Sequence, residues 1–126
     1  MNRTICPCGS GLVYLNCCQP YHQNAQPAPT AEALMRSRYA AFVVQDADYL
    51  YETTHKSTRK NVTKEGYLSS AQNTTWLKLE IIFAAVDVVE FKAYYLGRSL
   101  DTEVLHERSN FKKEEGKWFY VDGKFY

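Results

Sequence analysis

Residues 75–96 read TWLKLEIIFAAVDVVEFKAYYL, and their pattern is the strongest indication of the fold. Apolar side chains recur at every second position, which is the period of a β-strand with one buried face. The pattern predicts two strands, over residues 75–84 and 88–96. We expect their inward faces to lie against helices and to form the core: Leu77, Leu79, Ile81 and Phe83 from the first strand, and Val89, Phe91, Ala93 and Tyr95 from the second.

Two more segments with this period follow. Residues 103–113 and 117–122 are predicted strands, and Gly97 and Gly116 mark turns beside them. Capping residues and helical spacing predict three helices earlier in the chain. The first begins at Thr30, with Leu34, Met35, Tyr39, Phe42 and Val43 on one face; a shorter one begins at Asp46; a third covers residues 64–71. Helices followed by a run of strands predict an α+β domain with an antiparallel sheet, and they argue against a Rossmann-type nucleotide site.

All four cysteines lie at the N-terminus: Cys6, Cys8, Cys17 and Cys18. We predict one structural Zn²⁺ held by the four thiolates, because they fill a tetrahedral shell and leave no position open for water. Disulfides and an iron–sulfur cluster are the weaker alternatives, given the compartment and the spacing. The predicted units are residues 1–28, a zinc-binding knuckle (residues 1–18) with its proline-containing linker, and residues 29–126, the main domain.

The composition narrows the classes of function. The chain has 126 residues and a formal net charge of +1, with 15 Lys and Arg against 14 Asp and Glu. This balance argues against a nucleic-acid partner that is bound through many phosphates. The sequence has neither a long apolar segment nor a signal-peptide pattern, so we expect a cytoplasmic protein without a membrane partner.

The main domain carries a few polar side chains that could gather in a pocket between sheet and helices: Arg38, His55, Arg59, Trp76, His106 and Glu107. Glu107 shares its strand face with Leu105 and Phe111, so an inward face brings the carboxylate inward too. A buried carboxylate needs a partner, and we expect an ion pair with Arg36 or Arg38. The alternative is a protonated carboxyl group with an acid–base role, for which His55 is a second candidate.

Residues 6–18, CPCGSGLVYLNCC, resemble the SEC-C zinc motif of the SecA translocase. The main domain resembles the YchJ-like family, in the segments MRSRYAAF (35–42), DADYL (46–50), TH (54–55), LHERSNF (105–111) and WFYVDG (118–123). This resemblance implies a cone-shaped fold similar to nuclear transport factor two (NTF2), with a curved sheet around helices. It implies zinc binding but no known reaction. Leu12 and Val13 stand where SecA-type motifs are commonly basic, which argues against docking on the chaperone SecB.

Two functions are therefore predicted. In the first, the chain is an adaptor whose knuckle docks a protein partner, while the cone pocket can take a small molecule or a peptide. The exposed surface would include Leu12, Val13, Tyr14 and Leu15, unless these pack on the main domain. In the second, the chain is a small enzyme that uses the cone pocket, with Glu107 or His55 as general acid or base.

Overall fold

A computed structural model of the chain describes residues 4–126. Its longest helix, α2 (Ala31–Val44), begins where the side chain of Thr30 accepts a hydrogen bond from the N–H of Ala33 at 3.0 Å. It ends at Gln45, whose left-handed backbone (φ +63°) closes the last turn. The next helix, α3 (Ala47–Glu52), begins with the carboxylate of Asp46 accepting from the N–H of Tyr49. Both predicted caps are confirmed.

The third predicted helix is also present, as α5 (Lys64–Asn73). Three short helical turns were not expected from the sequence: η1 (Tyr14–Asn16), α1 (Gln19–His22) and α4 (Lys56–Arg59). Each is one turn long or less, and such turns have too few residues to show a helical apolar period.

Four antiparallel strands follow in the order β1-β2-β3-β4, as a simple meander. Their bounds are β1 (Trp76–Ala84), β2 (Val88–Leu96), β3 (Thr102–Glu114) and β4 (Lys117–Phe125). The last hairpin turns through Glu115 and Gly116, with φ of +52° and +79°, which is the tight two-residue turn that glycine favours. The α+β fold with an antiparallel sheet is confirmed, and β4 runs three residues past the predicted end at 122.

The predicted core face of β1 is correct only in its middle. Leu79 is buried and Ile81 is half-buried, whereas Leu77 and Phe83 are exposed. The pairing of β1 with β2 shifts once between Trp76 and Lys78 and again between Ile81 and Phe83. Each bulge inserts one residue and reverses the alternation beyond it, which a strict period of two cannot anticipate. On β2 the prediction holds, since Val89, Phe91 and Ala93 are buried and Tyr95 is half-buried.

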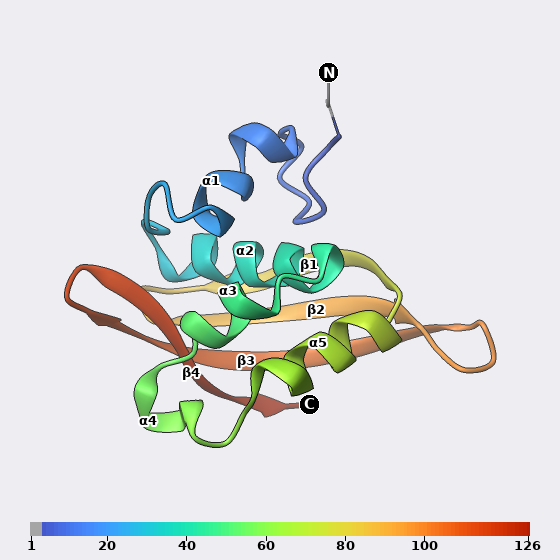
Figure 1. Cartoon of the computed structure of the whole chain (residues 1–126). Helices are drawn as coiled ribbons and strands as arrows, with labels where there is room; N and C mark the ends of the chain where they lie inside the picture. The colour runs from blue at the N-terminus through green and yellow to red at the C-terminus, as the bar shows by residue number, and fades with distance from the viewer. Residues whose placement is uncertain (1–3) are drawn as a thin grey trace.

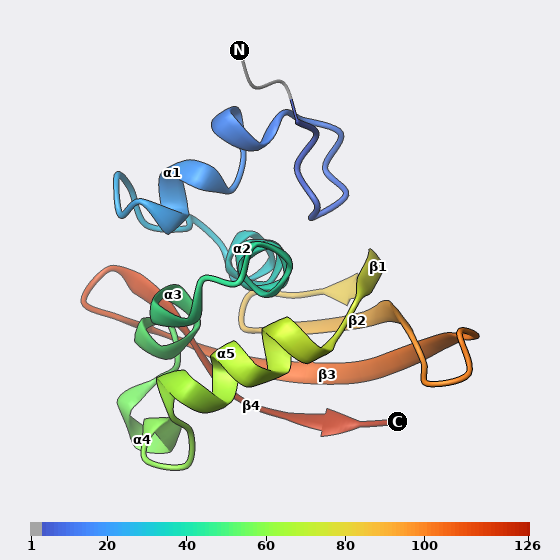
Figure 2. The ribbon, with the colours of Figure 1, turned by 45° about the vertical axis from the view of Figure 1, so that its right-hand side comes forward.

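The helices cover one face of the sheet, as Figure 1 shows. Figure 2, turned by 45°, shows α2 lying between the sheet and the N-terminal segment, with α5 beside it over the sheet. Helix α2 therefore contacts the knuckle on one side and the strands on the other. No helix within residues 4–126 is long and apolar enough to cross a bilayer.

Candidate functional site

The four cysteines meet in the knuckle, and their sulfur atoms lie within 4.8 Å of one another. Cys6, Cys8 and Cys18 are buried, and Cys17 is half-buried. The sulfur of Cys17 lies 3.6 Å from that of Cys8 and 3.9 Å from that of Cys18. Thiolates about 2.3 Å from a central Zn²⁺ have sulfur–sulfur separations of about 3.8 Å, so the four donors fit a tetrahedral metal.

A short turn brings the two cysteine pairs together. Gly9 and Gly11 have φ of +83° and +85°, a conformation that residues with a side chain rarely adopt. Between them, the hydroxyl of Ser10 lies 3.1 Å from the sulfur of Cys17 and accepts a hydrogen bond from the N–H of Leu12. The bonds fix this loop against the cysteine cluster.

Charge is unevenly shared among the thiols. Hydrogen bonds from the thiols of Cys18 and Cys6 lower the pKa of the Cys8 thiol. The same contacts with Cys6 and Cys8, together with burial, raise the pKa of Cys18. Closely packed thiolates repel one another, and a bound divalent cation is what allows several to be ionised together.

The knuckle packs on α2 through polar and apolar contacts. Ala40 is fully buried among Cys6, Cys8 and Cys18, where a larger side chain would hold the two parts apart. His22 donates from Nε2 to the carbonyl of Ser37 at 2.7 Å, and its Nδ1 accepts from the hydroxyl of Tyr14 at 2.5 Å. Burial lowers the pKa of His22, so the ring is kept neutral and acts as a structural bridge.

Part of the knuckle surface remains free. Ile5, Leu12 and Leu15 are 58%, 55% and 60% exposed, whereas Val13 and Tyr14 are half-buried. The segment therefore combines the two predicted arrangements. Tyr14 packs toward the main domain, and Leu12 and Leu15 face outward.

A cavity of about 380 Å³ lies between the helices and the inner face of the sheet. We call it the main cavity. Side chains from α2, α5 and all four strands line it, and seven of the fifteen lining residues are aromatic. The aromatic lining residues are Tyr39, Phe42, Tyr67, Trp76, Phe91, Tyr120 and Phe125.

Glu107 stands in the wall of the main cavity, as the strand pattern predicted, and is 6% exposed. Its Oε2 accepts hydrogen bonds from the hydroxyls of Ser109 (2.9 Å) and Tyr120 (2.7 Å). The predicted ion pair with Arg36 or Arg38 is wrong: within residues 4–126 Glu107 pairs with no cation, and Arg36 pairs with Glu32 on the knuckle side of α2. Two hydroxyls take the place of the guanidinium.

Arg38 also lines the main cavity but is directed to other acceptors. Its guanidinium donates to the carbonyl of Leu50 (2.8 Å) and to the hydroxyls of Thr53 (2.7 Å) and Tyr67 (3.2 Å). It also stacks 4.7 Å from the ring centroid of Tyr120. Arg38 thereby ties α2 to the end of α3 and to α5.

The structure brings three of the six pocket candidates together and separates His55 from them. Trp76 lines the main cavity with Arg38 and Glu107, and its indole N–H is buried with no partner among the described residues. His55 instead caps α4, accepting from the N–H of Ser57, and its Nε2 donates to Glu114 at 3.0 Å.

Of the remaining candidates, neither faces the cavity. His106 bonds Glu90 at 2.7 Å on the outer face of the sheet, and Arg59 donates to the carbonyl of Thr54.

Sequence reasoning missed two residues that contact Glu107 and a third elsewhere in the cavity wall. Tyr120 donates to it, and burial followed by the negative charge of Glu107 raises the pKa of Tyr120. Gly123 of β4 provides the space for the carboxylate, because a Cβ there would lie 1.9 Å from Oε2. Tyr39 is 3% exposed and its hydroxyl has no partner among the described residues. Only long-range pairing places these residues together, so no local signal could have identified them.

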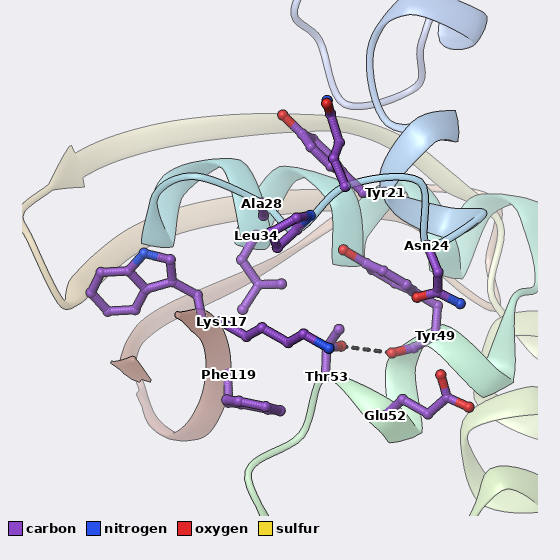
Figure 3. Close-up of a pocket in the computed structure, with 12 residues that line it drawn as sticks. Tyr21, Asn24, Ala28, Leu34, Tyr49, Glu52, Thr53, Lys117 and Phe119 are labelled. Atoms are coloured by element: carbon purple, nitrogen blue, oxygen red, sulfur yellow. Dashed lines mark hydrogen bonds between the residues drawn. The ribbon is translucent and has the colours of Figure 1, made fainter. Parts of the chain in front are cut away.

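A second, smaller cavity of about 210 Å³ lies under the linker (Figure 3). Figure 3 shows Lys117 and Phe119 of β4 on one side and Tyr21 and Asn24 of the N-terminal segment on the other. Most polar side chains around it, such as Glu52 and Lys117, are exposed surface groups. The charged side chains of the main cavity are more deeply buried than those around this second cavity.

The fold and the cysteine cluster define a class: an NTF2-like domain that carries an N-terminal SEC-C motif. Residues 30–123 match the family model described as "YchJ, middle NTF2-like domain", and residues 5–20 match the SEC-C motif. The chain belongs to the YchJ family, whose curated members are named UPF0225 proteins.

Individual relatives agree. The chain is 40% identical to the UPF0225 protein YchJ of Shigella dysenteriae and 41% identical to a UPF0225 protein of Pectobacterium carotovorum, over 94% of this chain and 82% and 81% of those proteins. It is similar to the solution structure of RPA3114, a SEC-C motif containing protein from Rhodopseudomonas palustris, with a TM-score of 0.87 and 34% identity over 98% of both chains. A crystal structure of a SEC-C motif containing protein from Psychrobacter arcticus matches with a TM-score of 0.77 and 29% identity, over 93% of this chain and 80% of that one. The cysteine cluster and the motif match together indicate metal binding.

Proposed function

We propose that this chain is a cytoplasmic adaptor that holds one structural Zn²⁺ and docks a protein partner through its knuckle. One observation carries the proposal: four cysteine sulfurs lie within 4.8 Å of one another in the same short segment that exposes Ile5, Leu12 and Leu15. A metal-held loop with an apolar surface is suited to binding and has no open coordination position for chemistry.

Zinc is favoured over other metals by the donor set. Four thiolates in a tetrahedral arrangement suit Zn²⁺, and they require a reducing compartment, which supports a cytoplasmic location. The knuckle has almost no core apart from the cysteines and Ala40, so its fold depends on the metal. The site carries a formal charge of −2, part of which Arg36 offsets through its hydrogen bond to the carbonyl of Cys8.

Native mass spectrometry of protein purified without chelator tests the metal. We expect one zinc ion per chain, lost together with the knuckle fold in the variant Cys17→Ser, while the main domain stays folded by its methyl NMR signals. A mass without metal that is lowered by disulfide formation would contradict the zinc assignment.

The docking surface is tested with two matched double variants. Leu12→Asp with Leu15→Asp places charges on the knuckle, and Val86→Asp with Leu100→Asp places the same charges on exposed apolar residues of two distant loops. A partner captured from a lysate of the source cells and then purified should bind the wild type and the loop variant. It should not bind the knuckle variant or the chelated protein. Equal binding to all four forms, or no reproducible partner, would refute docking through the knuckle.

The second candidate is a small enzyme, and the position of Glu107 in the main cavity favours it. His55 does not line that cavity, so Glu107 would act there without it. Incubating the protein with any small molecule that co-purifies with it distinguishes an enzyme from a binding protein. Conversion by the wild type but not by Glu107→Gln supports the enzyme, and recovery of the unchanged molecule supports binding alone.

A further inference from the structure

The main cavity has the size and lining of a binding site for a small molecule. Its volume of about 380 Å³ falls within the range of about 300–1,000 Å³ that such sites occupy. A neighbouring hollow shares Phe42, Val62, Tyr67 and Ser70 with it, along the beginning of α5. Seven of the fifteen lining side chains are aromatic, so the body of a ligand would meet ring faces.

Glu107 is a polar group in this wall that is held in place, but only one of its two carboxylate oxygens accepts hydrogen bonds from the described residues. Oε2 takes both hydrogen bonds, from Ser109 and Tyr120, and Oε1 accepts none from residues 4–126. Gly123 leaves the space in which the carboxylate sits. Oε1 is therefore the carboxylate oxygen that can accept a hydrogen bond from a donor group of a ligand.

No cation of the described residues forms an ion pair with Glu107. Arg38 shares the cavity wall, but its donors go to Leu50, Thr53 and Tyr67, and its guanidinium carbon lies 4.7 Å from the centre of the Tyr120 ring. An anionic ligand would therefore compete with bonds that Arg38 already makes, and it would also face Glu107.

Two more polar groups in the wall have no hydrogen-bond partner within residues 4–126. The hydroxyl of Tyr39 makes no hydrogen bond with a described residue although the side chain is 3% exposed, and the same is true of the buried indole N–H of Trp76. Their rings lie 6.0 Å apart between centroids at 66°. Tyrosine and tryptophan faces attract cations, which adds to the preference set by the carboxylate.

We propose that the main cavity binds a small organic amine, with its ammonium group on Oε1 of Glu107 and an apolar body among Tyr39, Trp76 and the neighbouring rings. This site is separate from the metal and from the knuckle surface, so it stands or fails independently of the adaptor function.

A matched series of three probes tests the charge preference. 2-Phenylethylamine, 2-phenylethanol and 3-phenylpropionate share a phenyl ring and differ in the head group, which is cationic, neutral and anionic at neutral pH. Each is titrated into ¹⁵N-labelled, metal-loaded protein while the two indole N–H signals are followed. Trp118 lines the second cavity and serves as the internal control. The variants are Glu107→Gln, which keeps the shape, and Glu90→Gln, which removes a carboxylate from the outer face.

We expect the amine to shift the Trp76 signal and not that of Trp118, and to bind about tenfold more tightly than the alcohol. The carboxylate should not bind. Glu107→Gln should abolish the advantage of the amine over the alcohol, and Glu90→Gln should preserve it.

Several results would overturn the proposal: no shift at Trp76 with the amine, equal or tighter binding of the alcohol or the carboxylate, or an unchanged preference in Glu107→Gln. If Glu107→Gln does not fold, the series with the wild type still decides the charge preference. Leu105→Trp, which fills the cavity from β3, should then abolish binding of the amine.

Discussion

The guanidinium of Arg36 donates a hydrogen bond to the backbone carbonyl of Cys8 at 2.8 Å. The same side chain pairs with Glu32 one helical turn earlier, at 3.1 Å, which orients it toward the knuckle. Arg36 thus joins the metal-binding loop to the helix that also lines the main cavity. Because a charged donor meets a carbonyl at a half-buried place, this bond is among the stronger contacts between the two parts.

The first prediction removes this bond. Arg36→Ala should release the metal several-fold faster to a competing chelator and lower the free energy of unfolding by about 1.5–3 kcal/mol, the usual range for a hydrogen bond that involves a charged group. Metal release is followed with a chromogenic chelator, and stability is measured by urea unfolding.

Arg98→Ala is the matched control, since Arg98 is an exposed loop arginine with no partner in residues 4–126. Equal release rates in the two variants would show that the bond to Cys8 does not hold the loop.

A second prediction concerns the close approach of Glu107 to Gly123. A methyl group at Gly123 would lie 1.9 Å from Oε2 of a buried carboxylate that two hydroxyls hold in place. Gly123→Ala should therefore lower the free energy of unfolding by about 1–3 kcal/mol, as overpacking does. Gly97→Ala should cost less, because the nearby Glu103 is exposed and can swing away.

A double-mutant cycle with Glu107→Ala separates the clash from other effects. The methyl group should cost little once the carboxylate is absent, so the two substitutions should not add. Strict additivity would mean that Gly123 is required for a reason other than Glu107.

The order and type of the main elements followed from local signals. Thr30 and Asp46 cap α2 and α3 as predicted, because capping depends only on residues three or four positions apart. The exposure of Leu77 and Phe83 could not be predicted from local signals. It depends on two bulges in the pairing of β1 with β2, and register is a property of two strands and not of one.

The candidate site shows the same division. Alternation along β3 placed Glu107 inside, and cysteine spacing gathered four thiols, both from local pattern. The partner of Glu107 was predicted by charge alone, which favours an arginine. Arg36 instead faces the knuckle, on the opposite side of α2, and Tyr120 from the neighbouring strand reaches the carboxylate first. Tertiary packing decided among several partners of suitable chemistry.

A third prediction concerns acid. The hydrogen bond from His55, followed by the charge of Lys56, lowers the pKa of Glu114. A carboxyl group with a lowered pKa in the folded state stabilises the fold above its unfolded pKa, about 4.3, and this contribution is lost as pH falls through the folded value. Between pH 7 and pH 3 the wild type should therefore lose more stability than Glu114→Gln, measured as urea midpoints. Glu115→Gln, in the adjacent turn, is the control and should behave as the wild type; an equal loss in Glu114→Gln would contradict the prediction.

The last prediction concerns alkali. Burial raises the pKa of Tyr39 to about 12 and that of Tyr49 to about 12, against about 10 for an unfolded tyrosine. Between these values the folded state binds more protons than the unfolded state. The tyrosines therefore contribute their full share to the free energy of unfolding below pH 10, and this share is lost as pH rises toward 12. Tyr39 alone should account for a loss of about 1 kcal/mol by pH 11.

The variant Tyr39→Phe should lose less stability than the wild type as pH rises. It should cost little stability at pH 8, because the hydroxyl that it removes has no partner among the described residues. Tyr126→Phe, at an exposed position, should leave the decline unchanged. Urea unfolding at pH 8 to 11, with tyrosinate absorbance at 295 nm, measures both quantities. Ionisation of Tyr39 before unfolding would contradict the prediction, because the folded state would then not hold this hydroxyl in its protonated form.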